Sequence, residues 1–112
     1  MQTHVNESDW KLFRKRLPEW QERHMEGLIR EYAALLSGSE KASDKFWALD
    51  KRIREDQRHV GVIARMSRSK MDMNIAALLY DGVITLDDLD EFSDELRERF
   101  AFIMRGQEDD EL

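Results

Sequence analysis

The chain has 112 residues, a length that suits one domain with a hydrophobic core of its own. Hydrophobic residues make up 41% and charged residues 38%, so we expect long solvated helix faces around that core. Because cysteine is absent, disulfides, thiolate metal sites, iron–sulfur clusters and cysteine nucleophiles are excluded.

Nothing in the sequence has the character of a targeting or membrane segment. The N-terminal residues lack the basic and apolar regions of a signal peptide. The longest apolar run extends only from Ile75 to Tyr80, whereas a membrane-spanning helix needs about 20 residues. We therefore expect a cytoplasmic protein with no membrane partner.

Two helices are predicted in the first third of the chain. The first begins after Ser8 as its cap, and its apolar face has spacings of three and four residues: Trp10, Phe13 and Leu17. Pro18 fits the first position of a second helix, which Ser37 and Gly38 end. The apolar face of this second helix is formed by Trp20, Leu28, Tyr32, Leu35 and Leu36.

Two more helices are predicted in the middle of the chain. Ser43 caps a third helix, whose apolar residues are Phe46, Leu49 and Ile53. A joint at His59 to Gly61 separates it from a fourth helix, which runs from Ile63 to Leu79 with room for a kink between Ser67 and Asp72.

The clearest amphipathic pattern lies near the C-terminus. Asp81 and Gly82 end the fourth helix, and Thr85 with Asp88 forms a capping box that opens a fifth. Its apolar stripe consists of Leu86, Leu89, Phe92, Leu96, Phe100 and Ile103.

These elements predict an all-α fold, because no alternating run is long enough to form a sheet. We expect a compact bundle of four to five helices whose last helix is strongly amphipathic and acidic. Residues 1–112 form a single helical domain in this prediction, with flexible ends at about 1–7 and 106–112.

Charge is distributed unevenly along the chain. Residues 1–43 are balanced, residues 44–70 carry a net charge of +4, and residues 71–112 carry −10, for a total of −6. One interpretation is that the two charged segments neutralise each other or are merely solvated. The other is that one of them binds a partner.

The leading functional interpretation places that partner on the acidic side of the predicted fifth helix. There, seven carboxylates lie off the apolar stripe and offer charge to a basic protein surface as phosphates do: Asp87, Asp88, Asp90, Glu91, Asp94, Glu95 and Glu98. The chain would then be a non-enzymatic protein-interaction module. In its specific form it would be a nucleic-acid mimic that inhibits a nuclease or defence complex, as anti-CRISPR proteins do. An apolar helix face that forms a homodimer is a second mode of interaction.

The alternative is a small DNA-binding transcriptional regulator that uses the basic middle of the chain. Its candidate residues are Lys51, Arg52, Arg54, Arg58, Arg65, Arg68 and Lys70. The net charge of −6 disfavours approach to phosphates, so direct nucleic-acid binding is the weaker interpretation.

Motifs for chemistry are missing from the sequence. An EF-hand aligned on Gly82 would put Ala77 and Leu79 at two ligand positions, and neither offers a side-chain oxygen. His4, His24 and His59 have no metal-ligand spacing, and nucleophile elbows and phosphate loops are absent. We predict no catalytic residue, no metal and no cofactor.

Aromatic residues and methionines each allow two interpretations. Trp10, Trp20 and Trp47 are typical of a core, or of a binding hot spot if they are exposed. Met66, Met71 and Met73 fill gaps in a core or line an adaptable groove.

Three segments, LPEWQERHMEGLIREY, SDKFWALDKRI and DGVITLDDLDEFSDELRE, resemble a group of small all-helical proteins of Gram-positive bacterial genomes. The resemblance covers most of residues 9 to 100. It implies a bacterial, cytoplasmic accessory protein, and brings no assigned activity, catalytic residue or cofactor.

Overall fold

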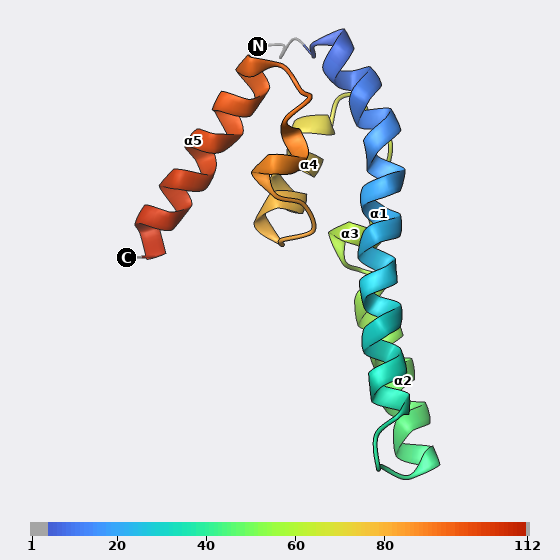
Figure 1. Cartoon of the computed structure of the whole chain (residues 1–112). Coiled ribbons are helices and arrows are strands. Elements are labelled where there is room, and N and C mark those ends of the chain that lie inside the picture. Colours follow the sequence, from blue (N-terminus) through green and yellow to red (C-terminus); the bar gives the residue numbers. More distant parts are fainter. Residues whose placement is uncertain (1–4, 112) are drawn as a thin grey trace.

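The computed structural model describes residues 5–111, and the side chains of residues 5–106. Within that range it is all-α, with five α-helices, one short 3-10 helix and no strand. The elements are α1 (Glu7–Leu36), α2 (Ala42–Asp56), α3 (Val60–Ile63), α4 (Met71–Tyr80), the 3-10 helix η1 (Leu86–Leu89) and α5 (Asp94–Glu111). Figure 1 shows their arrangement. The predicted all-α fold class is confirmed.

The first two predicted helices are a single helix, α1, so the break predicted at Pro18 is wrong. The helix begins two residues earlier than predicted and is capped by Asn6, whose Oδ1 accepts from the backbone N–H of Ser8 at 2.9 Å. Pro18 removes its own N–H from the helical ladder, and its ring crowds the carbonyl four residues earlier. Because Leu17 and Trp20 on either side of it are both buried, packing keeps the helix continuous.

Helix α2 folds back along the C-terminal half of α1, and together they form a helical hairpin, residues 21–56 (Figure 1). The third predicted helix is therefore present, although it begins at Ala42 and has Lys41 rather than Ser43 at its N-cap. The hairpin carries polar contacts between its helices. Tyr32 donates a hydrogen bond to Asp56, and burial followed by this bond raises the pKa of the Tyr32 hydroxyl to about 12.

The fourth predicted helix is interrupted by more than a kink. The chain forms only the short α3 after His59, leaves helical geometry at Ala64, and resumes at Met71 as α4. Gln21 of α1 stabilises the interruption, because its side-chain amide donates to the carbonyls of Val62 at 3.3 Å and Ala64 at 2.8 Å. These carbonyls therefore find a partner outside a helix.

The fifth predicted helix is also divided. Thr85 and Asp88 form the predicted capping box, but it opens the 3-10 helix η1, and α5 starts only at Asp94. The division is fixed by Asp9 of α1, a buried carboxylate that accepts from the Ser93 backbone N–H at 2.8 Å and hydroxyl at 2.7 Å. Ser93 in turn accepts from the Leu96 N–H at 3.3 Å, which starts α5.

The hydrophobic core lies between the first half of α1, α4, η1 and the first half of α5. Its buried side chains are Phe13, Leu17, Trp20, Met71, Ile75, Leu78, Leu79, Ile84, Leu89, Phe92, Leu96 and Phe100. The hairpin extends beyond this core, so the molecule is elongated, with dimensions of 54 × 35 × 25 Å. Leu86 and Ile103, at the two ends of the predicted apolar stripe, are exposed.

A pair of stacked histidines joins the hairpin to the start of α3. The rings of His24 on α1 and His59 before α3 lie 4.9 Å apart at an angle of 14°. A Cβ atom at Gly61 would lie 2.5 Å from the His24 ring, so only glycine permits this close approach. Burial lowers the pKa of His24, and the neighbouring His59 lowers it further.

The predicted flexible ends fall partly outside the described residues, since residues 1–4 and 112 are not described. The helical backbone of α5 continues to Glu111. No helix in residues 5–111 combines the length and the apolar character needed to cross a membrane.

Candidate functional site

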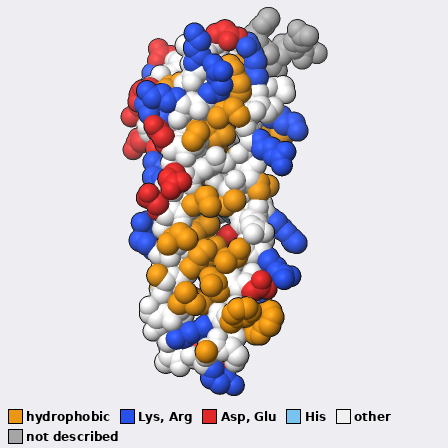
Figure 2. Space-filling model, turned by 90° about the vertical axis from the view of Figure 1, so that its right-hand side faces the viewer, with side chains coloured by type: hydrophobic (Ala, Val, Ile, Leu, Met, Phe, Trp, Pro, Cys, Tyr) orange, Lys and Arg blue, Asp and Glu red, His pale blue; other side chains and the backbone are white. Residues whose placement is uncertain are grey.

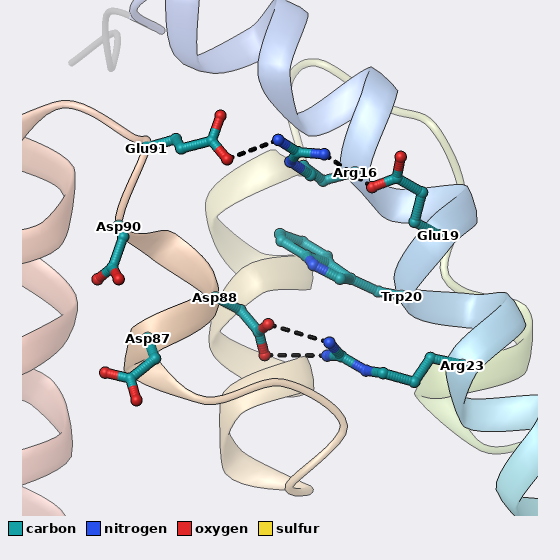
Figure 3. A pocket seen from close by; sticks show the side chains of 8 residues that line it. All are labelled: Arg16, Glu19, Trp20, Arg23, Asp87, Asp88, Asp90 and Glu91. Atoms are coloured by element: carbon teal, nitrogen blue, oxygen red, sulfur yellow. Dashed lines mark hydrogen bonds and ion pairs between the residues drawn. The ribbon is translucent and has the colours of Figure 1, made fainter.

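A polar cleft of about 420 Å³ opens between the middle of α1 and η1 (Figure 3). Its two walls come from segments far apart in the sequence. The α1 wall has spacings of three and four residues, which place its members on one helix face: Arg16, Glu19, Trp20 and Arg23. The opposite wall is acidic throughout: Asp87, Asp88, Asp90 and Glu91.

Arg23 and Asp88 form a two-point ion pair across the cleft, with N–O distances of 3.1 and 2.9 Å. The same Asp88 carboxylate accepts from the Thr85 backbone N–H at 2.8 Å. Partial burial acts to raise the pKa of Asp88, but the bonds from Arg23 and Thr85 outweigh it, and the pKa is lowered. Asp88 therefore stays ionised and tied to α1.

Arg16 lies between two carboxylates at the other end of the cleft. It donates to Glu19 on its own helix at 2.9 Å and to Glu91 at 2.6 Å. The hydrogen bond to Glu19 is the main reason that the pKa of Arg16 is raised, and the charge of Glu91 adds to it. Both pairs are partly exposed to solvent, and Arg16 links α1 to the segment that follows η1.

Four more of the predicted partner-binding carboxylates face solvent. Figure 3 shows Asp87 and Asp90 directed away from both arginines, and neither has an ion-pair partner among the described residues. Glu98 is exposed on α5 and is likewise unpaired there. Asp94, one turn earlier on α5, pairs only with Arg97 of its own helix and has a side chain that is 82% exposed.

We call Asp87, Asp90, Asp94 and Glu98 the acidic edge. The seven predicted partner-binding carboxylates thus separate into three groups, of which the acidic edge is the first. Asp88 and Glu91 are held by α1, whereas Glu95 lines a small second hollow with Asp72 and Arg99.

The predicted basic site is dispersed over the end of α2, the turn before α3 and the loop before α4. Three of its arginines are engaged with carboxylates: Arg52 with Glu31 and Asp56, Arg54 with Asp50, and Arg68 with Glu7. The remaining four have no ion-pair partner among the described residues: Lys51, Arg58, Arg65 and Lys70. No single helix presents all seven.

The α1 wall of the cleft is absent from the sequence-based site. A sequence pattern could have indicated this wall, because Arg16, Glu19 and Arg23 are placed around Trp20 at helical spacing. They carry charges of both signs. Their partners, Glu91 and Asp88, lie about 70 positions further along the chain, as the separations of 75 and 65 residues show. Sequence periodicity within one helix cannot supply such pairings.

The three tryptophans divide between the two interpretations. Trp20 is buried in the core and Trp10 packs against it, whereas Trp47 on α2 is 64% exposed. Among the methionines, Met71 is buried, and Met66 and Met73 are exposed.

Over the described part of the chain, no group of three or more histidine, aspartate and glutamate side chains is arranged to hold a metal ion. No family model, curated protein or solved structure matches the chain. The resemblance to small helical proteins of Gram-positive bacteria therefore stays a prediction.

Proposed function

We propose that the chain is a non-enzymatic helical protein-interaction module that binds a basic surface of a partner protein through the acidic edge. One observation carries the proposal. The arginines that α1 brings to this side of the molecule are already engaged with Asp88 and Glu91, so the acidic edge has no basic partner on α1.

The electrostatics of the whole segment support a basic partner. Residues 71–112 carry a net charge of −10, and the ion pairs with Arg16 and Arg23 neutralise only part of it. A field of one sign accelerates association with a surface of the opposite sign and suppresses other partners. The same ion pairs hold η1 against α1, so that the edge is presented in one geometry before the partner binds.

The chemistry of the cleft also fits binding better than catalysis. Neither histidine nor serine lines the cleft, so its lining offers no nucleophile–base pair of the usual kind. Asp88 has a lowered pKa, so it is unsuited to donate a proton near neutral pH. Glu91 and Asp88, which are paired with Arg16 and Arg23, are held in position, and such ion pairs suit binding.

In its narrower form, the proposal is that the acidic edge mimics nucleic-acid phosphates. Asp94 and Glu98 lie one turn apart on α5, which contacts the 3-10 helix that carries Asp87. A basic channel of a nuclease or defence complex would accept these negative charges in place of phosphates.

The DNA-regulator alternative rests on the four unpaired basic residues Lys51, Arg58, Arg65 and Lys70. They belong to a helix end and two connecting segments, so an arginine-rich helix for the major groove is not formed. This alternative predicts direct binding to DNA, which a gel-shift assay measures.

The test is affinity capture from host lysate treated with nuclease, with tagged parent protein and an acidic-edge variant carrying Asp87→Asn, Asp90→Asn, Asp94→Asn and Glu98→Gln. We expect the parent to retain a basic protein that double-stranded DNA displaces, and the variant to lose it, because four fixed charges are removed without change of shape. A matched control removes four exposed charges elsewhere and should retain the partner: Glu26→Gln, Glu40→Gln, Asp44→Asn and Glu55→Gln.

Equal capture by the parent and the acidic-edge variant would contradict the proposal. A gel-shift assay with random double-stranded DNA provides the second measurement. Direct binding by the parent, with an affinity that falls steeply as salt rises, would favour the regulator instead.

A further inference from the structure

The helical hairpin lacks a core. No residue from 21 to 60 is buried, although this stretch includes all of α2 and more than half of α1. The last buried residue before it is Trp20 and the first after it is Gly61. Isolated helices of about 15 residues are marginal in water, and helical stability in proteins comes mainly from packing an apolar face.

Large apolar side chains nevertheless occur along both helices of the hairpin. Their exposed fractions range from 37% to 64%. They are Met25, Ile29 and Leu36 on α1, and Phe46, Trp47 and Ile53 on α2. Figure 2 shows hydrophobic side chains gathered over the lower half of one face of the molecule, at the level where Figure 1 places the hairpin. We call these six side chains the hairpin face.

The contact between the two helices is mainly polar. Met25, Ile29 and Leu36 recur at intervals of four and seven, which puts them on one side of α1. Tyr32 belongs to the same side, and it is tied to α2 because it bonds to Asp56 and Arg52 lies 5.7 Å from its ring. The apolar side chains around Tyr32 remain exposed.

We propose that the hairpin face is a homodimer interface on which a second copy of this chain packs its own hairpin, so that the two hairpins form a four-helix bundle. In a four-helix bundle, the apolar stripes of all four helices face a shared core. The same patch meets itself about a two-fold axis, so the assembly closes at two copies.

The available area is sufficient for a stable dimer. Six large side chains, each about half exposed, present roughly 600 Å² of apolar surface per copy, given ~150–250 Å² for a large aromatic side chain. Two copies would bury roughly 1,200 Å² from these side chains alone, which reaches the range of specific interfaces before the rim is included.

The distribution of charge favours a second copy over a partner that is strongly basic or strongly acidic. Residues 22–56 hold seven basic and eight acidic residues, so the rim of the hairpin face is nearly neutral and two copies do not repel each other there. Residues 71–112, with a net charge of −10, would repel a second copy. An apolar centre with a balanced rim is typical of homodimer interfaces. This inference is independent of the acidic edge, which a hairpin dimer leaves exposed.

The experiment is sedimentation equilibrium of the full chain over a range of concentrations, for the parent and two variants. We expect the parent to have twice the 13.3 kDa mass of the chain. The double variant Ile29→Glu, Trp47→Glu should be monomeric, with a dimer dissociation constant raised about 30-fold or more. The control Phe102→Glu, at a side chain that is 71% exposed on α5, should remain a dimer.

Amide hydrogen exchange locates the interface and removes the ambiguity of a misfolded variant. On dilution of the parent, exchange should accelerate in residues 21–56 and remain unchanged in α4 and in α5 up to Phe100. A parent that is monomeric at about 100 μM, well above the Kd of a micromolar dimer, would overturn the proposal. So would a dimer whose protected amides lie in α5, or one that the double variant leaves intact.

Discussion

Single polar side chains decide where this chain changes direction. Asp9 is 3% exposed and binds both the N–H and the hydroxyl of Ser93, so the turn before α5 is anchored to the first turn of α1. Gln21 does the same for the segment after α3. Buried polar groups that satisfy backbone atoms in this way are costly to replace, because the freed N–H or carbonyl loses its partner.

The His24 side chain gives the fold a dependence on pH. Its Nε2 atom is buried without a hydrogen-bond partner, and its pKa is lowered by burial and by His59, against the opposing charges of Asp56 and Glu31. Because the folded state disfavours the protonated form, its contribution to stability is complete above pH 6.5, the ordinary pKa, and is lost as pH falls below that value.

We therefore expect the free energy of unfolding, measured by urea titration, to decrease as pH falls from about 7 to 5, a window above the titration of most carboxylates. His24→Phe keeps a ring to stack on His59 and removes the ionisable group, so its profile should be flatter. Parallel profiles for the parent and this variant would show that His24 is not responsible.

At the scale of the element, α1 illustrates how packing overrides a local signal. Pro18 lies inside a helix of 30 residues, where proline is about 3 kcal/mol less favourable than alanine. The helix continues because Phe13, Leu17 and Trp20 require one uninterrupted face against α4 and α5. Pro18 itself is exposed and contributes nothing to that core.

Replacing Pro18 should therefore stabilise the protein. Pro18→Ala restores a backbone N–H to the helical ladder and removes no buried surface, so we expect the free energy of unfolding to rise by about 1–3 kcal/mol. Chemical denaturation of both proteins measures the difference. An unchanged or lower value would mean that a proline-dependent bend in α1 is needed to seat the core.

At the scale of the whole molecule, stability is concentrated in one half. The core gathers α4, η1 and the adjoining halves of α1 and α5, while the hairpin of α1 and α2 has no buried residue. Exposed large apolar side chains, by contrast, occur in both halves: Phe46 and Trp47 lie on the hairpin, and Tyr80 and Phe102 lie outside it.

Two substitutions of the same kind measure this division. Phe100 is 2% exposed and Phe46 is 64% exposed. Phe100→Ala should lower the free energy of unfolding by about 3–5 kcal/mol, the usual cost of a core cavity. Phe46→Ala should change it by less than about 0.5 kcal/mol in dilute solution. Similar losses for both variants would show that the hairpin is buried even in the dilute protein.

By itself, the sequence determined the all-α class, the turn at Asp81 and Gly82, and the capping box of Thr85 and Asp88. The joint predicted at His59 to Gly61 is only partly correct, because the break lies at residues 57–59 and Gly61 belongs to α3. These features depend on residues a few positions apart, where side-chain periodicity, glycine conformation and capping act locally. The acidic character of the segment after Thr85 was likewise visible in composition alone.

Only the tertiary structure decided where helices continue or break, and which charges remain available. Pro18 is tolerated, and the last predicted helix is divided, because Leu17 and Asp9 have partners far along the chain. Likewise, α1 neutralises Asp88 and Glu91 and leaves Asp87 and Asp90 in solvent. Such pairings between distant segments arise when the chain packs, and no local pattern encodes them.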